Sequence, residues 1–548
     1  MANFSSKILG SSISSLTAQQ ALIANTSNNI ANVNTPGYSR RIIDVESRGD
    51  VANVGTILQI GSGVQLSEIK RLTNEFLEYQ LRTSNSRKGN ANIRNDYLSS
   101  VEPAFALDGP QNTVGAALNN FFSAVSQVGV NPTNVDLRIN VMQRGEDLIS
   151  TIKSSFNTVA NIQSELNQRV GLEVNAVNSM TEQIAVLNSQ IGTREASGIG
   201  AIDERDQRDV LLNKLAEKIS FKTLETPNGM INLYLDNGFP LVNQETSRAL
   251  EVTTSPSFAA ASLPRSLSGD VLSYITYDFG SPQAPSHLDL TQLIKNGSGA
   301  LAGILQLRGT TDPSNTSAFQ AEGDLVAIAS RIEAISRALL TTVNQAYRGV
   351  DEDSGTAGLQ PNSGDLFGNT PSVFGLFDFD FSGVKDVDGD GIPTLSDLDG
   401  TTPSVANFSS LLKLGFTDPS AFAAARDNDP TQGSTVFPPG DGQNAAAVAA
   451  LRSQSFTFSL GSFNFTGTLE EAYNSSVSYV GNSKSAAQVE VDVANSMLEA
   501  AQNKRDEFAA VSLDEEFANL IKYQKAFQAS ARMIRTVGEL LDQIVSLI

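Results

Sequence analysis

The residues best placed to do chemistry are the closely spaced aspartates of one acidic loop. In the twelve-residue segment 386–397, aspartates occupy the first, third, fifth and twelfth positions: Asp386, Asp388, Asp390 and Asp397. In a calcium loop the first three carboxylates converge on the cation, the glycine at position 6 permits a sharp turn, and the carbonyl of position 7, here Ile392, completes the set. The spacing therefore predicts a structural calcium site, and a solvated acidic turn is the alternative.

Other catalytic arrangements have little support in the sequence. The chain has no cysteine and a single histidine, His287, which lies in the turn-rich stretch SPQAPSHLDL and is expected at the surface. Neither a GxxxxGK[ST] loop nor a strand-coupled GxGxxG is present, so nothing indicates a nucleotide site. A hydrolase built on carboxylates alone stays open, but no acidic pair is singled out by its surroundings. We expect no enzyme, no catalytic residue and no required cofactor.

Charge excludes further classes of protein. The 38 basic and 59 acidic residues give a net charge of -21, which argues against nucleic acid and anionic membranes as partners. Residues 350–430 alone contain 14 acidic and three basic residues, typical of a solvated outer face. The basic pairs Lys70–Arg71 and Arg87–Lys88 are isolated and are expected on solvated helical faces.

The N-terminal stretch lacks the apolar core of a secretory signal peptide. No segment approaches the roughly 18 consecutive apolar residues of a membrane-spanning helix. The sequence therefore predicts a soluble chain that, if it leaves the cell, does so without a cleaved signal peptide.

Both ends of the chain carry apolar residues at heptad spacing. The N-terminal set and the C-terminal set are Leu9, Leu16, Ile23 and Ile30, and Leu513, Leu520, Tyr523, Phe527, Ile534, Val537, Leu541, Ile544 and Ile548. Such a seam buries one stripe and needs a facing helix. We interpret the two sets as an assembly seam, in which the ends pair with each other or with neighbouring subunits. Two ordinary core helices are the alternative.

The interior alternates between helix and strand. A heptad pattern broken by Gln163 and Glu173 predicts a long helix over 153–191, and 321–348 is again helical. Asn228-Gly229 and Asn237-Gly238 flank an alternating apolar run, and Gly461-Ser462 divides a second one, so hairpins are predicted at both places.

These patterns predict an α+β multidomain protein in which terminal helices form a coiled-coil or helical-bundle rod and β-rich domains are inserted between them. The predicted division is a terminal coiled-coil assembly domain, a helical rod domain, a β-rich lobe and an acidic outer insertion: 1–65 with 505–548; 66–218 with 322–348 and 468–504; 219–321; and 349–467.

Two terminal motifs resemble those of the flagellar rod, hook and hook-associated protein family. The first is SNNIANVNTPGYSR at 27–40, in which Asn29, Asn32, Pro36, Gly37 and Tyr38 carry the likeness. The second is LDEEFANLIKYQKAFQASAR at 513–532, which is similar to the closing motif of hook-associated members, with Phe527 where a tyrosine is usual. The segments IDERDQRD at 202–209 and GALAGIL at 299–305 also fit the family.

The resemblance implies an extracellular structural component of the bacterial flagellum that forms the junction ring between hook and filament and is required for filament assembly. It implies export by the flagellar type III system. The implied partners are further copies in a homo-oligomeric ring, the hook protein, the second junction protein, flagellin indirectly, and an export chaperone at the C-terminal helix. A hook or other axial flagellar protein is the alternative within the family, and a secreted calcium-binding adhesin is the alternative outside it.

Overall fold

The fold is seen in a computed structural model that describes residues 2–48, 63–105, 113–254, 266–268, 270–278, 287–310, 322–348, 363–366, 375–379, 408–426 and 437–546. The chain divides into two compact units. Unit 1 combines Met1–Lys88, Val177–Arg248 and Val493–Ile548, and unit 2 combines Gly89–Ala176 and Ala249–Asp492. The four-part division made from the sequence stays a prediction.

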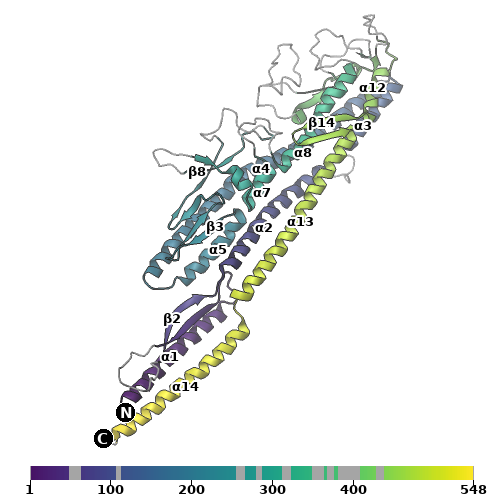
Figure 1. The fold of residues 1–548 in the computed structure, drawn as a ribbon. Coiled ribbons are helices and arrows are strands. Elements are labelled where there is room, and N and C mark those ends of the chain that lie inside the picture. The colour runs from purple at the N-terminus through teal and green to yellow at the C-terminus, as the bar shows by residue number, and fades with distance from the viewer. Residues whose placement is uncertain are drawn as a thin grey trace. The chain divides into compact units, whose positions relative to one another are not determined.

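The two ends of the chain meet in unit 1. Helix α1 (Ala2–Ala31) packs along α14 (Leu513–Ser546), as Figure 1 shows in purple and yellow. Between them in sequence, strands β1 (Arg41–Ser47) and β2 (Val64–Arg71) pair antiparallel and contact α1. Acidic residues in the first turn of α14 complement the positive end of its helix dipole. We call α1, the β1–β2 hairpin and α14 the terminal module.

Unit 1 also contains a helical hairpin that carries a small sheet. The last turns of α4 (Val135–Ala196) lead into α5 (Ile202–Lys218), followed by a four-stranded antiparallel sheet of order β3-β4-β5-β6. The strands are Lys222–Glu225, Ile231–Tyr234, Pro240–Asn243 and Thr246–Ser247. Gly229 and Gly238 have φ values of +76° and +89° in the two turns, which confirms the predicted hairpins.

Asn188 joins this sheet to the helices. Its side-chain amide donates to the carbonyls of Ile231 and Gln244 at 2.7 Å each, and its oxygen accepts from Arg208 at 3.0 Å. Asn188 is fully buried, so these bonds satisfy polar groups that water does not reach.

The long helix predicted over 153–191 is confirmed within α4. Phe156, Val159, Leu166 and Val170 are fully buried in unit 2. Gln163, which breaks the apolar pattern, is buried as well, because its amide donates to the carbonyl of Arg308 at 2.7 Å and accepts from the Leu267 amide at 2.7 Å. The polar residue that interrupts the heptad pattern therefore joins α4 to Arg308 and to Leu267.

The remaining helices and strands lie wholly or partly in unit 2, where small antiparallel sheets stand between the helices. Helices α2 and α13 have residues in both units. The helices are α2 (Glu75–Val101), α3 (Val114–Val130), α6 (Thr291–Lys295), α7 (Ala300–Arg308), α8 (Asp324–Ala338), α9 (Asn344–Arg348), α11 (Phe408–Leu411), α12 (Gln443–Ala450) and α13 (Leu469–Ala509). The strands are β7 (Leu250–Thr253), β8 (Tyr274–Asp278), β9 (His287–Asp289), β10 (Ser363–Gly364), β11 (Phe377–Phe379), β12 (Leu412–Leu414), β13 (Ala425–Arg426), β14 (Phe456–Leu460) and β15 (Phe463–Gly467).

Two predictions for unit 2 can be compared directly with these elements. The hairpin about Gly461 is confirmed by the antiparallel pairing of β14 with β15. The helix predicted over 321–348 is interrupted, because a π-helical turn at Leu339–Val343 separates α8 from α9. None of the described helices is both long and apolar enough to cross a membrane. The architecture is α+β, with long helices and several small sheets.

Candidate assembly site

Helices α1 and α14, which carry the predicted seams, pack along each other in the terminal module. Val537 is buried at 7% exposure, and the other members are half-buried: Leu9, Leu16, Ile23, Ile30, Leu520, Tyr523, Phe527, Ile534 and Leu541. The hydroxyls of Ser15 and Ser530 also approach to 3.0 Å across the pair. One helix pair thus covers each stripe only in part, and a further partner is needed to bury it fully.

Leu513 stands one heptad before Leu520 in the first turn of α14. It is 41% exposed, so the stripe is less covered at this end of the helix. The side chain of Ile544 and all of Ile548 lie outside the described residues.

Asn29 and Tyr38 of the N-terminal motif form a buried polar joint between α1 and β1. Asn29 accepts hydrogen bonds from the Tyr38 hydroxyl at 2.8 Å and the Arg41 amide at 3.1 Å, and it donates to the Arg41 carbonyl at 2.9 Å. Asn29 is 1% exposed and Tyr38 is 9% exposed. Burial raises the pKa of Tyr38 to about 12, with the Arg41 guanidinium acting in the opposite direction. The motif thus fixes the angle at which the chain leaves the first helix.

The other motif residues shape the turn that follows α1. Asn32 donates to the carbonyl of Asn28 at 3.0 Å and so closes the end of the helix, and Pro36 is exposed in the turn. Gly37 has φ = +82°, and a Cβ there would lie 2.2 Å from Cγ2 of Val210 on α5. Only glycine fits, because any side chain would combine backbone strain with a steric clash.

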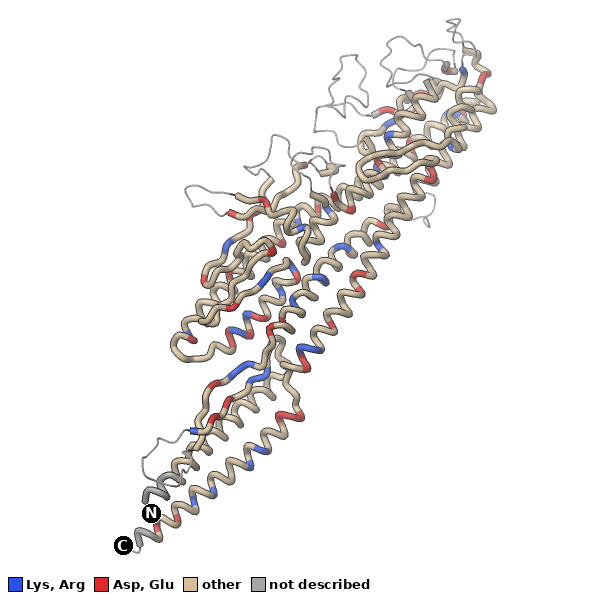
Figure 2. Tube along the Cα trace, in the orientation of Figure 1, with Lys and Arg blue, Asp and Glu red and all other residues tan. Residues whose placement is uncertain are grey.

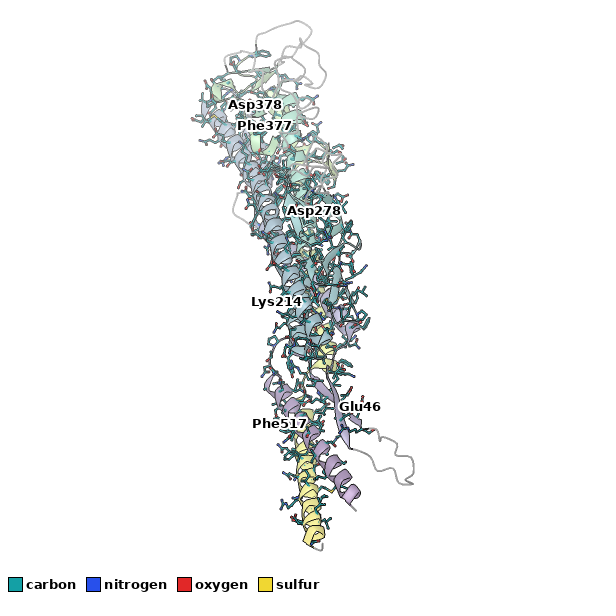
Figure 3. The ribbon with its side chains drawn as sticks, turned by 90° about the vertical axis from the view of Figure 1, so that its left-hand side faces the viewer. Glu46, Lys214, Asp278, Phe377, Asp378 and Phe517 are labelled. Atoms are coloured by element: carbon teal, nitrogen blue, oxygen red, sulfur yellow. The ribbon has the colours of Figure 1, made fainter. Side chains whose placement is uncertain are left out.

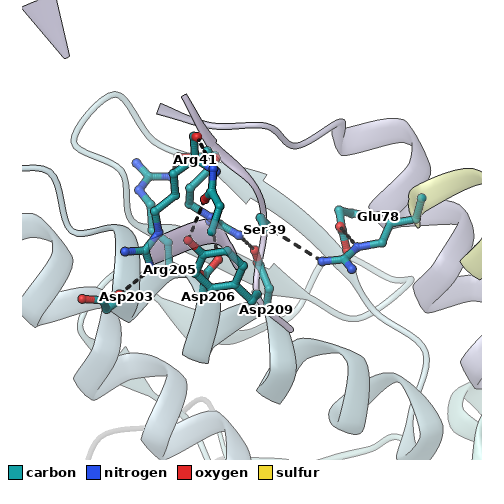
Figure 4. Close-up of polar contacts among 12 residues, drawn as sticks. Ser39, Arg41, Glu78, Asp203, Arg205, Asp206 and Asp209 are labelled. Atoms are coloured by element: carbon teal, nitrogen blue, oxygen red, sulfur yellow. Dashed lines mark hydrogen bonds and ion pairs between the residues drawn. The ribbon is translucent and has the colours of Figure 1, made fainter. Parts of the chain in front are cut away.

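Arginines of the hairpin meet aspartates of α5 at the base of the terminal module (Figure 4). Arg41 pairs with Asp203 at 2.5 Å and with Asp206 at 3.2 Å. Arg71 pairs with Asp206 at 2.8 Å and also with Asp209. Burial raises the pKa of Asp206, although both arginines oppose that shift. The cluster holds the hairpin against α5.

This cluster corrects one sequence prediction. Lys70–Arg71 lies on strand β2 rather than on a helix, and the Arg71 side chain is 9% exposed rather than solvated. A signal was present in the sequence, since Asp203, Asp206 and Asp209 recur every third residue and so share one face of a helix. Nothing local to Arg71 indicated that this acidic face would be its partner.

A second set of ion pairs holds the start of α14 and the end of α13. Arg40 pairs with Glu515 at 2.7 Å and with Glu516 at 2.8 Å, and its amide donates to the Ala509 carbonyl at 2.9 Å. Arg505 on α13 pairs with Glu78 on α2 at 3.2 Å. Three segments far apart in sequence are therefore joined within a few residues of Arg40.

The residues considered for calcium binding or catalysis are not part of the terminal module. The predicted calcium ligands Asp386, Asp388, Asp390, Ile392 and Asp397 lie outside the described residues. Within the described ranges, no group of three or more His, Asp or Glu side chains is arranged to hold a metal ion. His287 lies on β9 with its Nε2 at 3.2 Å from Oε2 of Glu251, and its side chain is 26% exposed.

Family models match three parts of the chain. The flagellar hook-associated protein FlgK helical domain matches residues 98–360, the flagellar basal body rod FlgEFG protein C-terminal model matches 502–547, and the flagella basal body rod protein model matches 9–38. Full-length relatives named flagellar hook-associated protein 1 agree with this. The chain is thus similar to flagellar hook-associated protein 1 from one end to the other.

The likeness to these relatives extends over the whole chain. The protein of Escherichia coli (strain K12) is 24% identical, covering 99% of this chain and 100% of its own length. That of Salmonella typhimurium is 25% identical with the same coverage, and that of Bacillus subtilis (strain 168) is 24% identical over 97% of this chain and 96% of its own.

A solved structure shares the fold. The flagellar hook junction protein FlgK from Burkholderia pseudomallei superimposes with a TM-score of 0.59 at 16% identity, covering 79% of this chain and 100% of that one. The two rod-family matches fall on α1 and α14, the helices that pair in the terminal module. The proteins that this chain resembles are accordingly structural components of the flagellum.

Proposed function

We propose that the protein forms the junction ring between the flagellar hook and the filament and that filament assembly requires it. The observation that supports this most is the partly covered seam between α1 and α14. Half-buried leucine, isoleucine and phenylalanine side chains along both helices gain burial when neighbouring copies complete the bundle. The ring copies contact the hook protein on one side and the second junction protein on the other, and flagellin follows.

The proposal also covers the export route of the protein and its location. The chain leaves the cell unfolded through the flagellar type III system and works outside the cell, with an export chaperone covering the C-terminal helix beforehand. It acts through assembly and not through catalysis. A hook or other axial flagellar protein is the second candidate, and it is favoured by the match of both terminal helices to rod-protein models.

Deletion of the gene in the source bacterium tests the junction role. The junction proposal expects bare hooks by electron microscopy, with flagellin secreted into the medium and unassembled. Loss of the hooks themselves would favour the second candidate, and normal filaments would contradict both. Complementation with the wild-type chain serves as the control.

A further inference from the structure

An apolar groove runs between α4 and α5 in unit 1. It has a volume of about 620 Å³, and its apolar wall is formed by Val186, Leu187, Val210 and Leu211. Val186 is 53% exposed, which shows that the groove is open to solvent. Glu182 is the charged residue at its rim. An open apolar groove between two helices is the kind of surface that accepts the apolar side of a third helix.

The start of α14 carries a row of exposed apolar side chains, which we call the ridge. Leu513, Phe517 and Ile521 are 41%, 49% and 59% exposed and stand at i, i+4 and i+8, so they share one side of the helix. Phe517 is labelled in Figure 3. Leu513 also occupies the heptad position of the seam, and from it Phe517 and Ile521 lead away from the seam residues Leu520 and Phe527, which are half-buried. Large apolar side chains at this spacing are the anchors of helix-in-groove recognition.

The ridge and the groove lie on either side of the same short segment of chain. Arg40 pairs with Glu515 and Glu516 beside the ridge, and the next residue, Arg41, pairs with Asp203 and Asp206 on α5. Gly37 lies against Val210 in the groove wall. Yet Phe517 and Val186 both stay about half exposed, so the ridge does not fill the groove of its own copy.

We propose that the α14 ridge of one copy seats in the α4–α5 groove of a second copy. Because ridge and groove are different surfaces of the same chain, the contact is heterologous and can continue from copy to copy around a ring. Charge supports the same pairing, since Lys525 stands four residues after Ile521 and continues the row of the ridge, and Glu182 lies at the groove (Figure 2 shows the basic residues along α14). The inference rests on the proposed function, and it names the surfaces through which the copies meet.

Cysteine cross-linking of assembled flagella tests the contact, because the chain has no cysteine of its own. Copies carrying Val186→Cys and copies carrying Phe517→Cys are produced together in cells that lack the native gene, and isolated hooks are oxidised. Mixed disulfide dimers are expected. The matched control replaces Phe517→Cys by Met533→Cys, which is 53% exposed on another side of α14, and its yield of mixed dimers is expected to be at least tenfold lower.

Each other outcome contradicts the contact. Normal incorporation without mixed dimers overturns the ridge-in-groove contact and leaves the junction role standing. Dimers formed by Phe517→Cys copies alone indicate a symmetric contact, and a cross-link to a different flagellar protein indicates another occupant; both overturn the proposal. Absence of the wild-type chain from hooks overturns the junction role and the contact together.

A charge swap gives an independent measurement on the same surfaces. Lys525→Glu should lower the cross-linking yield several-fold, and adding Glu182→Lys should restore it. Lys522→Glu, which makes the same change of charge on another side of α14, is the control. Equal yields for Lys525→Glu and wild type would contradict the assigned register of the ridge.

Discussion

Arg40 and Glu516 stand 476 positions apart in the sequence, and Nε of Arg40 donates a hydrogen bond of 2.8 Å to Oε1 of Glu516. The Glu516 side chain is 3% exposed, so its carboxylate depends on this partner. The first residues after the N-terminal motif are thus tied to the first turn of the C-terminal helix, where the two family motifs meet.

Replacing Arg40 by methionine should loosen the start of α14. A buried carboxylate that loses a charged partner costs about 2–3 kcal/mol, and the loss falls on Glu516. Hydrogen exchange at residues 513–520 should become faster, with little change at 156–170. Lys525→Met, at an exposed position on α14, is the control. Unchanged exchange at 513–520 would show that Arg40 does not hold the helix.

Charges placed in the seam should block assembly. In Leu520→Asp with Ile534→Asp, carboxylates enter the stripe that faces α1, where burying them is costly. We expect a folded unit 2 by circular dichroism and no incorporation at the hook. Ala529→Asp with Thr536→Asp adds the same charge at exposed positions of α14 and should incorporate normally. Incorporation of the seam variant would exclude the seam from the assembly.

The ends should order fully only on assembly. The seam residues are half-buried, and their partial burial offsets little of the conformational entropy that two long helices lose. In the free monomer, residues 1–35 and 510–548 should exchange amide hydrogens much faster than 156–191. Protection of the ends equal to that of 156–191 would make them ordinary core helices.

The acidic loop should bind calcium. Titration of the full chain by calorimetry should show heat at up to millimolar calcium, the range of extracellular calcium modules, and calcium should raise the melting temperature of the outer insertion only. Asp388→Ala with Asp390→Ala should abolish both effects without preventing filament growth. Asp427→Ala with Asp429→Ala removes the same charge outside the loop and should keep them. Absence of heat in the wild type would favour a solvated turn.

Tyr38 should make the joint sensitive to high pH. Its pKa is raised to about 12 in the folded chain from about 10 when unfolded, so the stability it contributes is complete below pH 10. That contribution is lost as the pH rises through 12, because only the neutral phenol suits the buried site. Tyr38→Phe should be about 1 kcal/mol less stable at pH 8 through loss of the Asn29 bond, and the difference should shrink above pH 10.

Denaturant unfolding of both chains from pH 8 to 11.5 checks this prediction. Tyr79→Phe, which removes a phenol that is 50% exposed, controls for the loss of a surface hydroxyl. A difference between Tyr38→Phe and wild type that stays constant with pH would contradict it.

The sequence alone determined the features that depend on local geometry. The heptads of α1, α4 and α14 predicted helices, because a helix repeats its buried side about every 3.6 residues whatever its partner is. The turns at Gly229, Gly238 and Gly461 predicted hairpins, because glycine enters the left-handed region that these turns require.

Only the tertiary structure decided which of these elements meet. Arg40, Arg41 and Arg71 find their carboxylates on α5 and α14, at positions 138 to 476 residues away. An ion pair between distant residues leaves no periodic trace in the sequence, so Arg71 looked like a solvated cation. The apolar stripe of α14 shows the same limit, since Leu520 is half-buried in the packed helix pair and Leu513, at the same heptad position, is exposed. Periodicity marks an apolar stripe, but only a packed neighbour decides how far along the helix that stripe is covered.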